Sequence, residues 1–259
     1  MKKNICFSVI TIAYNCESEI EATIVSVLKQ TYPCVDYVII DGESSDGTMN
    51  IVESYKGKIA TVVSEPDAGI YNAMNKGLNK CKGDYVIFMN AGDVFASNSV
   101  LERMAVKIDE LNEKPSLAYG TYMEMPNGKV IPNRSPKMCW YGMFASHQAM
   151  FYNLDFLQNN GIVYDESYRI AADYKMTISV VVKSRNKLLN ILRTDICVAK
   201  FDTTGISCSN PDLGLREADR ARREVLGYGH AKIVLIHWLL LAARFVRIGM
   251  KPLYQKLRY

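Results

Sequence analysis

The sequence lacks the glycine-rich motifs of two large classes of nucleotide-binding protein. No Gly-x-Gly-x-x-Gly run follows the first predicted strand, and no Gly-x-x-x-x-Gly-Lys-Ser/Thr run occurs anywhere in the 259 residues. Both runs let backbone amides approach phosphates closely. Their absence removes the usual basis for predicting a dinucleotide-dependent dehydrogenase or a P-loop enzyme.

Long hydrophobic runs and cysteine motifs are missing as well. The most apolar segment, 233–243, has about half the length that a membrane-spanning helix needs. The seven cysteines show no CxxC spacing, and four lie in or beside apolar segments: Cys6, Cys34, Cys81 and Cys197. This usage predicts reduced, structural thiols in a cytoplasmic protein. No signal peptide is expected, because the N-terminus leads directly into a strand.

An excess of one charge is confined to the C-terminal segment. Residues 1–228 carry 25 basic and 27 acidic side chains, so a nucleic-acid-binding body is not expected. Residues 229–259 hold six Lys or Arg and no acidic residue. A polar stripe with a seven-residue repeat runs along this segment: His230, His237, Arg244 and Lys251, with Arg247 beside them. The stripe predicts an amphipathic helix on anionic lipid, and the alternative is a helix packed on the body or on a second subunit.

Apolar runs and amphipathic segments alternate over the first 95 residues. Strands are predicted at 7–13, 37–40, 58–64 and 85–89, and helices at 18–30, 48–55 and 70–80. Such alternation is typical of a parallel sheet with right-handed crossovers. The next part, 96–210, has a mixed α+β pattern. Its predicted helices are 98–112, 154–159 and 173–183, and its strands 117–123, 129–131, 149–152, 187–192 and 196–201.

Polar residues follow three of the first four predicted strands. They are Asn15, Asp41 and the pair Asn90 and Asp93. The carboxyl ends of parallel strands meet at one edge of the sheet, so these side chains are expected to converge on a nucleotide-binding crevice. Oxygen ligands of this kind suit Mg²⁺ or Mn²⁺. For the pair alone, the alternative is an ordinary polar turn.

Four segments in this order resemble the family 2 glycosyltransferases of the GT-A fold. They are 8–15, 41–48, 65–77 and 83–93, and in the second half 146–148 and 171–174 look like the acceptor-side motifs of the same group. The resemblance covers about residues 5–210 and is greatest to bacterial enzymes of surface-polysaccharide (colanic-acid-like or exopolysaccharide) assembly. It implies an α/β, Rossmann-like, mostly parallel sheet with helices on both faces. The implied division is a nucleotide-sugar half (1–95), an acceptor half (96–210) and a basic, amphipathic helical tail (211–259).

The resemblance also implies which residues bind the nucleotide-sugar donor. They are Thr11, Ala13, Tyr14, Asn15, Asp41, Asp67, Gly69, Asn72, Lys76, Asn90 and Ala91. Asp41 is expected to face the base, with a turn-capping role as the alternative. In the family's metal motif, usually Asp-x-Asp, the last Asp matches Asp93, which is therefore the expected ligand of Mg²⁺ or Mn²⁺. This chain departs from the motif at its first position, where Asn90 stands.

On the acceptor side, Asp173 matches the family's catalytic base. The residue before it is often acidic in the family and is Ala172 here; the alternative for Asp173 is a helix N-cap. His147, Gln148 and Arg169 are expected to contact acceptor or phosphate, although a lone histidine is more often structural. The loop 202–207 is expected to close over the donor.

Together these features predict an inverting, metal-assisted glycosyltransferase. Its donor is a nucleotide-sugar, and its acceptor is a hydroxyl of a saccharide, expected to be lipid-linked, at the inner face of the cytoplasmic membrane. A homodimer is compatible with the tail. Two other classes remain open: an inactive, membrane-docked partner of another transferase, and a sugar-phosphate nucleotidyltransferase. The second normally has a Gly-rich first loop with Arg and a Pro-Lys pair, which 14–17 lacks.

Overall fold

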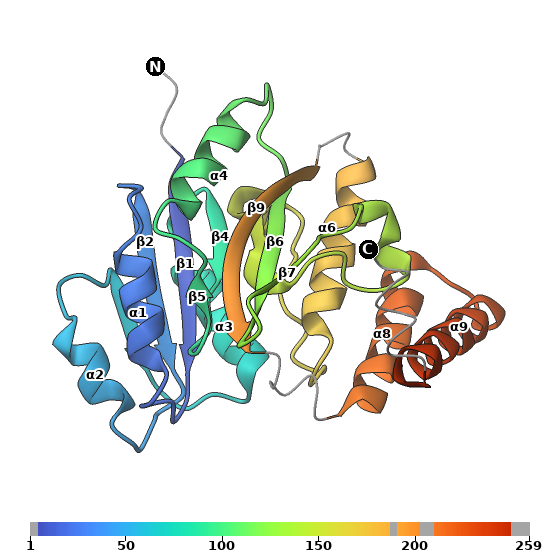
Figure 1. Ribbon diagram of the computed structural model, residues 1–259, viewed down its shortest axis with the longest axis horizontal. Coiled ribbons are helices and arrows are strands. Elements are labelled where there is room, and N and C mark those ends of the chain that lie inside the picture. Colours follow the sequence, from blue (N-terminus) through green and yellow to red (C-terminus); the bar gives the residue numbers. More distant parts are fainter. Residues whose placement is uncertain (1–4, 187–190, 203–209, 250–259) are drawn as a thin grey trace.

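The computed structural model describes residues 5–186, 191–202 and 210–249, and one mixed sheet runs through them (Figure 1). It has nine strands in the order β3-β2-β1-β4-β8-β6-β9-β5, with β7 beside β6. The strands are β1 (Phe7–Ala13), β2 (Val35–Asp41), β3 (Thr61–Ser64), β4 (Tyr85–Phe88), β5 (Val94–Phe95), β6 (Leu117–Met125), β7 (Lys129–Ile131), β8 (Met150–Asn153) and β9 (Ile191–Asp202).

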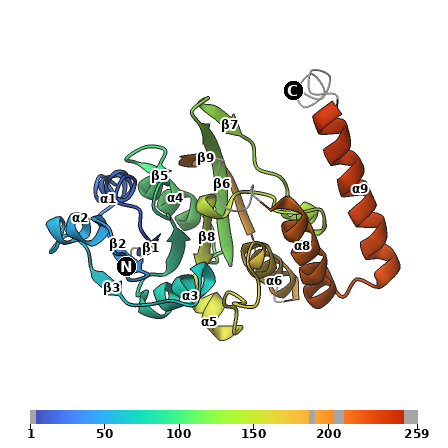
Figure 2. The ribbon, with the colours of Figure 1, turned by 90° about the horizontal axis from the view of Figure 1, so that it is seen from below.

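Helices cover both faces of this sheet (Figure 2). They are α1 (Ile20–Leu28), α2 (Thr48–Ser54), α3 (Ile70–Lys80), α4 (Val100–Asp109), α5 (Leu154–Asn159), α6 (Ala172–Asn186), α8 (Pro211–Leu226) and α9 (His230–Gly249), with 3₁₀ turns η1 (Pro136–Trp140) and η2 (His147–Ala149). Successive residues of β1 point to opposite faces. Ile10 packs in a core with α3 and α6, whereas Val9 packs in another with α1 and α4.

The pairing of the strands confirms the predicted α/β architecture. The strands β3, β2, β1 and β4 are parallel neighbours. The strand β8 then runs antiparallel to both β4 and β6, and β6 pairs in parallel with β9. The carboxyl ends of β1, β2 and β4 therefore share one edge, as expected, and the second half of the chain completes the sheet with mixed pairing.

The prediction of two separate strands near residues 187–201 is wrong. Instead of separate strands at 187–192 and 196–201, the structure has the single strand β9, and 187–190 lie outside the described residues. The residues between the two predicted strands, 193–195, are polar. The register with β6 shifts there, and Thr194 Oγ1 donates to the carbonyl of Tyr119 at 3.0 Å. The irregularity absorbs the polar residues without ending the strand.

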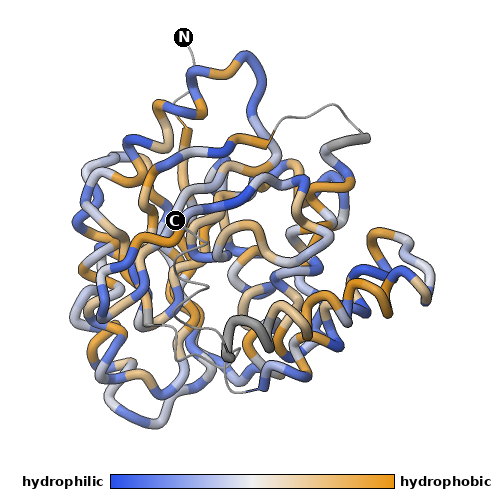
Figure 3. Tube along the Cα trace, turned by 45° about the vertical axis from the view of Figure 1, so that its right-hand side comes forward, coloured by the Kyte–Doolittle hydropathy of each residue, from blue (hydrophilic) through white to orange (hydrophobic). Residues whose placement is uncertain are grey.

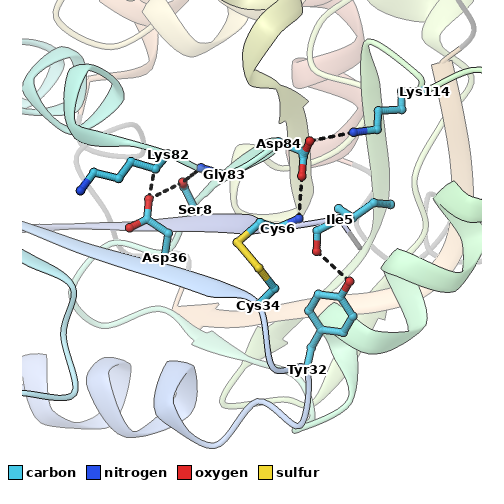
Figure 4. The surroundings of a disulfide bond; sticks show 10 residues. All are labelled: Ile5, Cys6, Ser8, Tyr32, Cys34, Asp36, Lys82, Gly83, Asp84 and Lys114. Carbon is cyan, nitrogen blue, oxygen red and sulfur yellow. Dashed lines mark hydrogen bonds and ion pairs between the residues drawn. A yellow bond between two sulfur atoms is a disulfide. The ribbon is translucent and has the colours of Figure 1, made fainter. Parts of the chain in front are cut away.

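The prediction of reduced thiols is wrong for Cys6 and Cys34, which form a disulfide (Figure 4). Each directly precedes a residue of the β1–β2 register pair Phe7 and Val35, so their Cα atoms lie 4.8 Å apart. The pairing depends on the register of two strands, which no local sequence pattern reveals. The bond lies at the amino ends of the strands, away from the edge where the polar loops meet.

The helix α8 is packed into the body through a buried arginine. Arg222 has 1% of its surface exposed, and its guanidinium donates to Asp219 at 2.7 Å and to the carbonyls of Trp140 and Tyr141 at 2.7 and 2.8 Å. Both views show α8 between α6 and α9 (Figures 1 and 2). The division of the chain at residue 210 stays a prediction, but α8 packs on α6, where Glu224 accepts a hydrogen bond from Lys175.

The helix α9 turns part of its predicted polar stripe toward the protein. His237 Nδ1 meets the Asp219 carboxylate on α8, and Ile233 and Ile236 are buried. The opposite face exposes apolar side chains: Val234, Leu235, Trp238 and Leu239. Hydrophobic positions are visible along α9 at the edge of the molecule in Figure 3. Within the described residues, no helix has the length and apolarity needed to cross a membrane.

Candidate active site

The loops after β1 and β2 are joined by hydrogen bonds at the predicted edge. Ser45 N donates to Asn15 Oδ1 at 2.9 Å, and Asn15 N donates to Ser44 Oγ at 2.8 Å. Asp41 is fully buried beside them and accepts from Ser44 Oγ at 2.5 Å and from Ser64 Oγ at 2.6 Å. The two loops and β3 thus fix the Asp41 carboxylate in one orientation.

Two predicted donor-site residues, Tyr14 and Asp67, lie beside Gly42, and a third, Gly69, bonds to Asp67. A Cβ atom at this glycine would lie 2.6 Å from Asp67 Oδ2 and 3.2 Å from the ring of Tyr14. Tyr14 itself is 65% exposed. Asp67 also accepts from Gly69 N at 2.8 Å, and Gly69 has a φ of 119°, which favours glycine, where α3 begins. An exposed aromatic ring, a carboxylate and a helix N-terminus therefore lie at one edge.

Two other predicted donor residues interact with acidic side chains. Asn72 Nδ2 donates to Glu166 at 3.0 Å, and Lys76 forms an ion pair with Glu65 at 2.9 Å. A cavity of about 490 Å³ is lined by 68–72 and 166–169, which include Gly69, Asn72 and Arg169. Glu166 also lines this cavity. It was not predicted, because Asn72 on α3 is 94 positions away in the sequence and only folding brings the two residues together.

Thr11 and Ala13 lie buried beneath this edge. Thr11 Oγ1 donates to the carbonyl of Met89 at 2.7 Å, which ties β1 to the end of β4. Ala13 has 1% of its surface exposed, and its carbonyl accepts from Gly42 N at 2.9 Å. Ala91 N donates to the carbonyl of Ile12 at 3.1 Å. These bonds hold the three strand ends together.

The segment Asn90–Asp93 forms a closed turn after β4. Asn90 N donates to Asp93 Oδ2 at 3.1 Å, and Asp93 N donates to the carbonyl of Asn90 at 2.9 Å. Gly92 adopts a φ of 93°, and its amide donates to Thr23 Oγ1 on α1 at 3.0 Å. The interpretation as a polar turn is thus correct for the backbone. It does not exclude a ligand, because Asn90 Oδ1 is buried without a partner among the described residues.

Asp93 is 7% exposed, and burial raises the pKa of its carboxyl to about 6. Two residues of η2 oppose this rise in pKa: His147 through its charge and Gln148 through a hydrogen bond. The predicted acceptor-side residues His147 and Gln148 therefore lie beside the predicted metal ligand.

His147 also faces the predicted base. Its Nδ1 lies 3.6 Å from Asp173 Oδ2, and its Nε2 is buried with no partner in the part of the chain that the structure describes. Asp173 lies in the first turn of α6, which begins at Ala172, and its Oδ1 accepts from Tyr174 N at 2.7 Å. Asp93, His147 and Asp173, which come from three separate elements, thus form one cluster.

These residues fit a weakly held hard cation. Asp93 supplies a carboxylate, and Asn90 Oδ1 and His147 Nε2 have no hydrogen-bond partner among the residues that the structure describes. Across 5–186, 191–202 and 210–249, no group of three or more His, Cys, Asp or Glu could hold a metal ion. A cation here would need further oxygens, which the phosphates of a bound donor supply. The predicted lid 202–207 lies largely outside the described residues.

A parallel sheet edge with an acidic turn after β4, and a second carboxylate on the other side of His147, is the arrangement expected of a GT-A type glycosyltransferase. The profile named Glycosyl transferase family 2 matches residues 8–157. The chain belongs to this family and is a glycosyltransferase.

Curated relatives agree with this class. A PGL/p-HBAD biosynthesis glycosyltransferase of Mycobacterium bovis is 29% identical over 185 residues, which cover 66% of this chain and 68% of the relative. The UDP-Glc:alpha-D-GlcNAc-diphosphoundecaprenol beta-1,3-glucosyltransferase WfgD of Escherichia coli is 30% identical over 156 residues, covering 60% of this chain and 56% of WfgD.

Solved structures share the fold. TarS 1–349 of S. aureus in complex with UDP has a TM-score of 0.67 at 21% identity, covering 92% of this chain and 71% of that one. The mannosyltransferase PcManGT of Pyrobaculum calidifontis, in complex with GDP-Man and Mn²⁺, has a TM-score of 0.65 at 16% identity, covering 93% and 75%.

Proposed function

We propose that the protein is an inverting glycosyltransferase of cell-surface polysaccharide biosynthesis, which moves a sugar from a nucleotide-sugar to a hydroxyl of a lipid-linked saccharide. The observation that carries the proposal is the cluster of Asp93, His147 and Asp173 at the carboxyl edge of the sheet. The acceptor class is supported by WfgD, whose name gives a diphosphoundecaprenol-linked sugar as its acceptor.

The donor's nucleoside would bind between Tyr14 and Asp67. Asp41 would face the base: a carboxylate has about four acceptor positions, and Ser44 and Ser64 use three of them. The diphosphate would lie near Gly69, where the dipole of α3 favours negative charge. Asn72, Lys76 and Arg169 would then line the path of the phosphates and sugar.

Asp173 would act on the acceptor hydroxyl as general base. It would take the hydroxyl proton while that oxygen forms a bond to the anomeric carbon. The bond between this carbon and the donor phosphate oxygen breaks on the opposite side, so the configuration inverts. A bound Mg²⁺ or Mn²⁺, held by Asp93 and Asn90, would neutralise charge on the departing nucleoside diphosphate. His147 borders both carboxylates, and Gln148 lowers the pKa of Asp93 through a hydrogen bond. These two residues would hold the metal ligand and the base in fixed positions relative to each other.

The two alternative classes are less consistent with these observations. A nucleotidyltransferase is disfavoured by the family assignment. An inactive partner would have no need of Asp93 and Asp173, yet both are present and border His147.

A nucleotide-sugar is expected to raise the melting temperature of the protein in the presence of Mn²⁺. At about 100 times its dissociation constant, a ligand stabilises the folded state by about 2.7 kcal/mol, which shifts the melting temperature by several degrees. UDP-, GDP- and dTDP-sugars would be compared by thermal shift, with Mn²⁺ alone as the control. Release of nucleoside diphosphate from the stabilising donor would then be measured. Stabilisation without any release or transfer would favour the inactive partner.

We propose further that α9 docks the enzyme on the inner face of the cytoplasmic membrane. The exposed side chains Leu235 and Trp238 form part of an apolar face, and 229–259 contains six basic residues and no acidic ones. This combination suits the surface of an anionic bilayer, where apolar side chains enter the interface and basic residues meet lipid headgroups. The apolar face would enter the membrane interface, because His237 on the other side of α9 meets Asp219 of α8.

The double variant Leu235→Glu/Trp238→Glu is expected to lose most of its binding to vesicles that contain phosphatidylglycerol. Each of these side chains contributes about 1.5–3 kcal/mol when buried, so sedimentation with vesicles should fall at least tenfold. Val106→Glu is the matched control, because Val106 is 54% exposed on α4. If the double variant sediments like the control, the membrane proposal fails. A dimer that dissociates in the double variant without any vesicle binding would instead identify a subunit interface.

A further inference from the structure

The amino end of α6 is held by a carboxylate from a distant helix. Three successive backbone amides, those of Arg169, Ile170 and Ala171, donate to the Glu217 side chain of α8, each at 2.9 Å. Arg169 uses Oε1, and the other two share Oε2. Glu217 is 8% exposed, so these bonds are largely shielded from water.

These hydrogen bonds satisfy backbone amides at the start of α6, which every helix must pair with groups outside its own hydrogen-bond ladder. The first amides of a helix and of the turn before it lack partners within the helix, and they are normally satisfied by a nearby side chain. Here the cap comes from 46 to 48 residues along the chain. Its negative charge also lies at the positive end of the helix dipole. The next two amides, those of Ala172 and Asp173, oppose the rise in the pKa of Tyr71 on α3 that burial causes, so the hydroxyl of Tyr71 lies near them.

The position of Asp173 depends on this cap. Asp173 is two residues beyond Ala171, and its side chain reaches His147 from the first turn of α6. A first turn frays easily when its amides are unsatisfied. Charge-assisted bonds to three consecutive amides limit that movement, because each of them fixes the backbone directly.

The other hydrogen bonds between α8 and this region, within the part of the chain that the structure describes, join side chains. Glu224 accepts from Lys175 of α6 and from the hydroxyl of Tyr168. These bonds attach α8 to the same loop and helix but leave the amides of 169–171 untouched. Glu224 is therefore a matched comparison for Glu217 on the same helix.

We infer that Glu217 is a positioning residue for catalysis: by capping α6 it holds Asp173 where the acceptor hydroxyl loses its proton. The inference rests on the proposed role of Asp173. It gives α8 a part in the chemistry, although α8 contributes no group to the cluster itself.

The test is Glu217→Gln in the 259-residue chain. The amide keeps the size of the side chain, but one oxygen becomes an NH₂ group that cannot accept a hydrogen bond. The turnover number for transfer should fall at least tenfold, and this loss should exceed any change in the dissociation constant of the donor, which Arg169 is proposed to contact. Amide hydrogen exchange at 169–171 should accelerate. Glu224→Gln should leave all three quantities within twofold of wild type.

A cycle with Asp173→Asn separates positioning from general loss of structure. If Glu217 acts through Asp173, Glu217→Gln lowers the rate in the wild-type background but not in the Asp173→Asn background. Equal losses in both backgrounds would overturn the inference. If the Glu217→Gln variant does not fold, Glu217→Asp is used in its place. This variant keeps the negative charge on a side chain that is one methylene shorter. An unchanged turnover number in Glu217→Asp would also overturn the inference. If Asp173→Asn alone retains full transfer, Asp173 is not the catalytic base. That result would contradict the proposed function, whereas the capping of α6 by Glu217 would be unaffected.

Discussion

Asp173→Asn is expected to lower the rate of sugar transfer about a thousandfold, while donor binding stays within twofold of wild type. General base catalysis contributes about 10²–10⁴-fold, and an amide of the same shape cannot take a proton from the acceptor hydroxyl. The 3.6 Å contact with His147 and the bond from Tyr174 N involve one oxygen each, so an amide can keep part of this geometry. Single-turnover measurements with saturating donor would report the chemical step.

Asp165→Asn is the control for this substitution. Asp165 lies in the loop before α6 and pairs with Lys175 at 2.6 Å, so the control also removes a carboxylate bonded to α6. We expect its transfer rate to remain within a few-fold of wild type. A rate for Asp173→Asn as high as that of the control would contradict the assignment of the base.

The elements with the clearest periodicity were predicted to the residue. The strand β1 (Phe7–Ala13) and the helix α3 (Ile70–Lys80) have the predicted bounds. In β1 every residue is buried, including Ser8 and Thr11, and its β-branched residues were enough to predict a strand. In α3 the buried residues recur at helical spacing on one face. The strand β9 was harder, because its polar middle is accommodated only by the register shift against β6.

The sequence allowed most residues of the candidate site to be named, but it did not show which of them lie beside one another. Asp93 and Asp173 are 80 positions apart in the chain, and only the fold brings both beside His147. Glu166 and Glu217 escaped prediction because their partners lie on other elements: Asn72 on α3 for one, and the amides before α6 for the other. Neither contact leaves a local pattern in the sequence.

The same limit applies to α9. Its amphipathic pattern was correctly read as helical, but a helical wheel does not tell which face meets the protein. The pair of His237 and Asp219 turns the polar residue inward, and Trp238 beside it is left 67% exposed. Orientation followed from one partner on α8, which cannot be read from the segment alone.

Asp93→Asn is expected to have two opposite effects. The variant should lose most of the Mn²⁺-dependent stabilisation by a nucleotide-sugar, because the cation loses its carboxylate ligand. Without metal or donor, however, it should be more stable than wild type at pH 8. Burial raises the pKa of the Asp93 carboxyl from 3.8 to about 6, so ionising this group in the folded protein costs up to about 3 kcal/mol.

The dependence on pH distinguishes this explanation from a general change in packing. Because the pKa of Asp93 is higher in the folded than in the unfolded chain, the native state binds the proton more tightly, and wild-type stability falls as pH rises from about 4 to 6. The amide of the Asp93→Asn variant does not titrate, so the stability advantage of the variant should be complete above about pH 7 and absent near pH 4. Donor stabilisation of the wild type should show the reverse trend and weaken below pH 6, where protonation competes with Mn²⁺. Denaturant unfolding with EDTA at pH 4 and pH 8 would measure the first effect, and an equal difference at both values would rule out Asp93 ionisation as its cause.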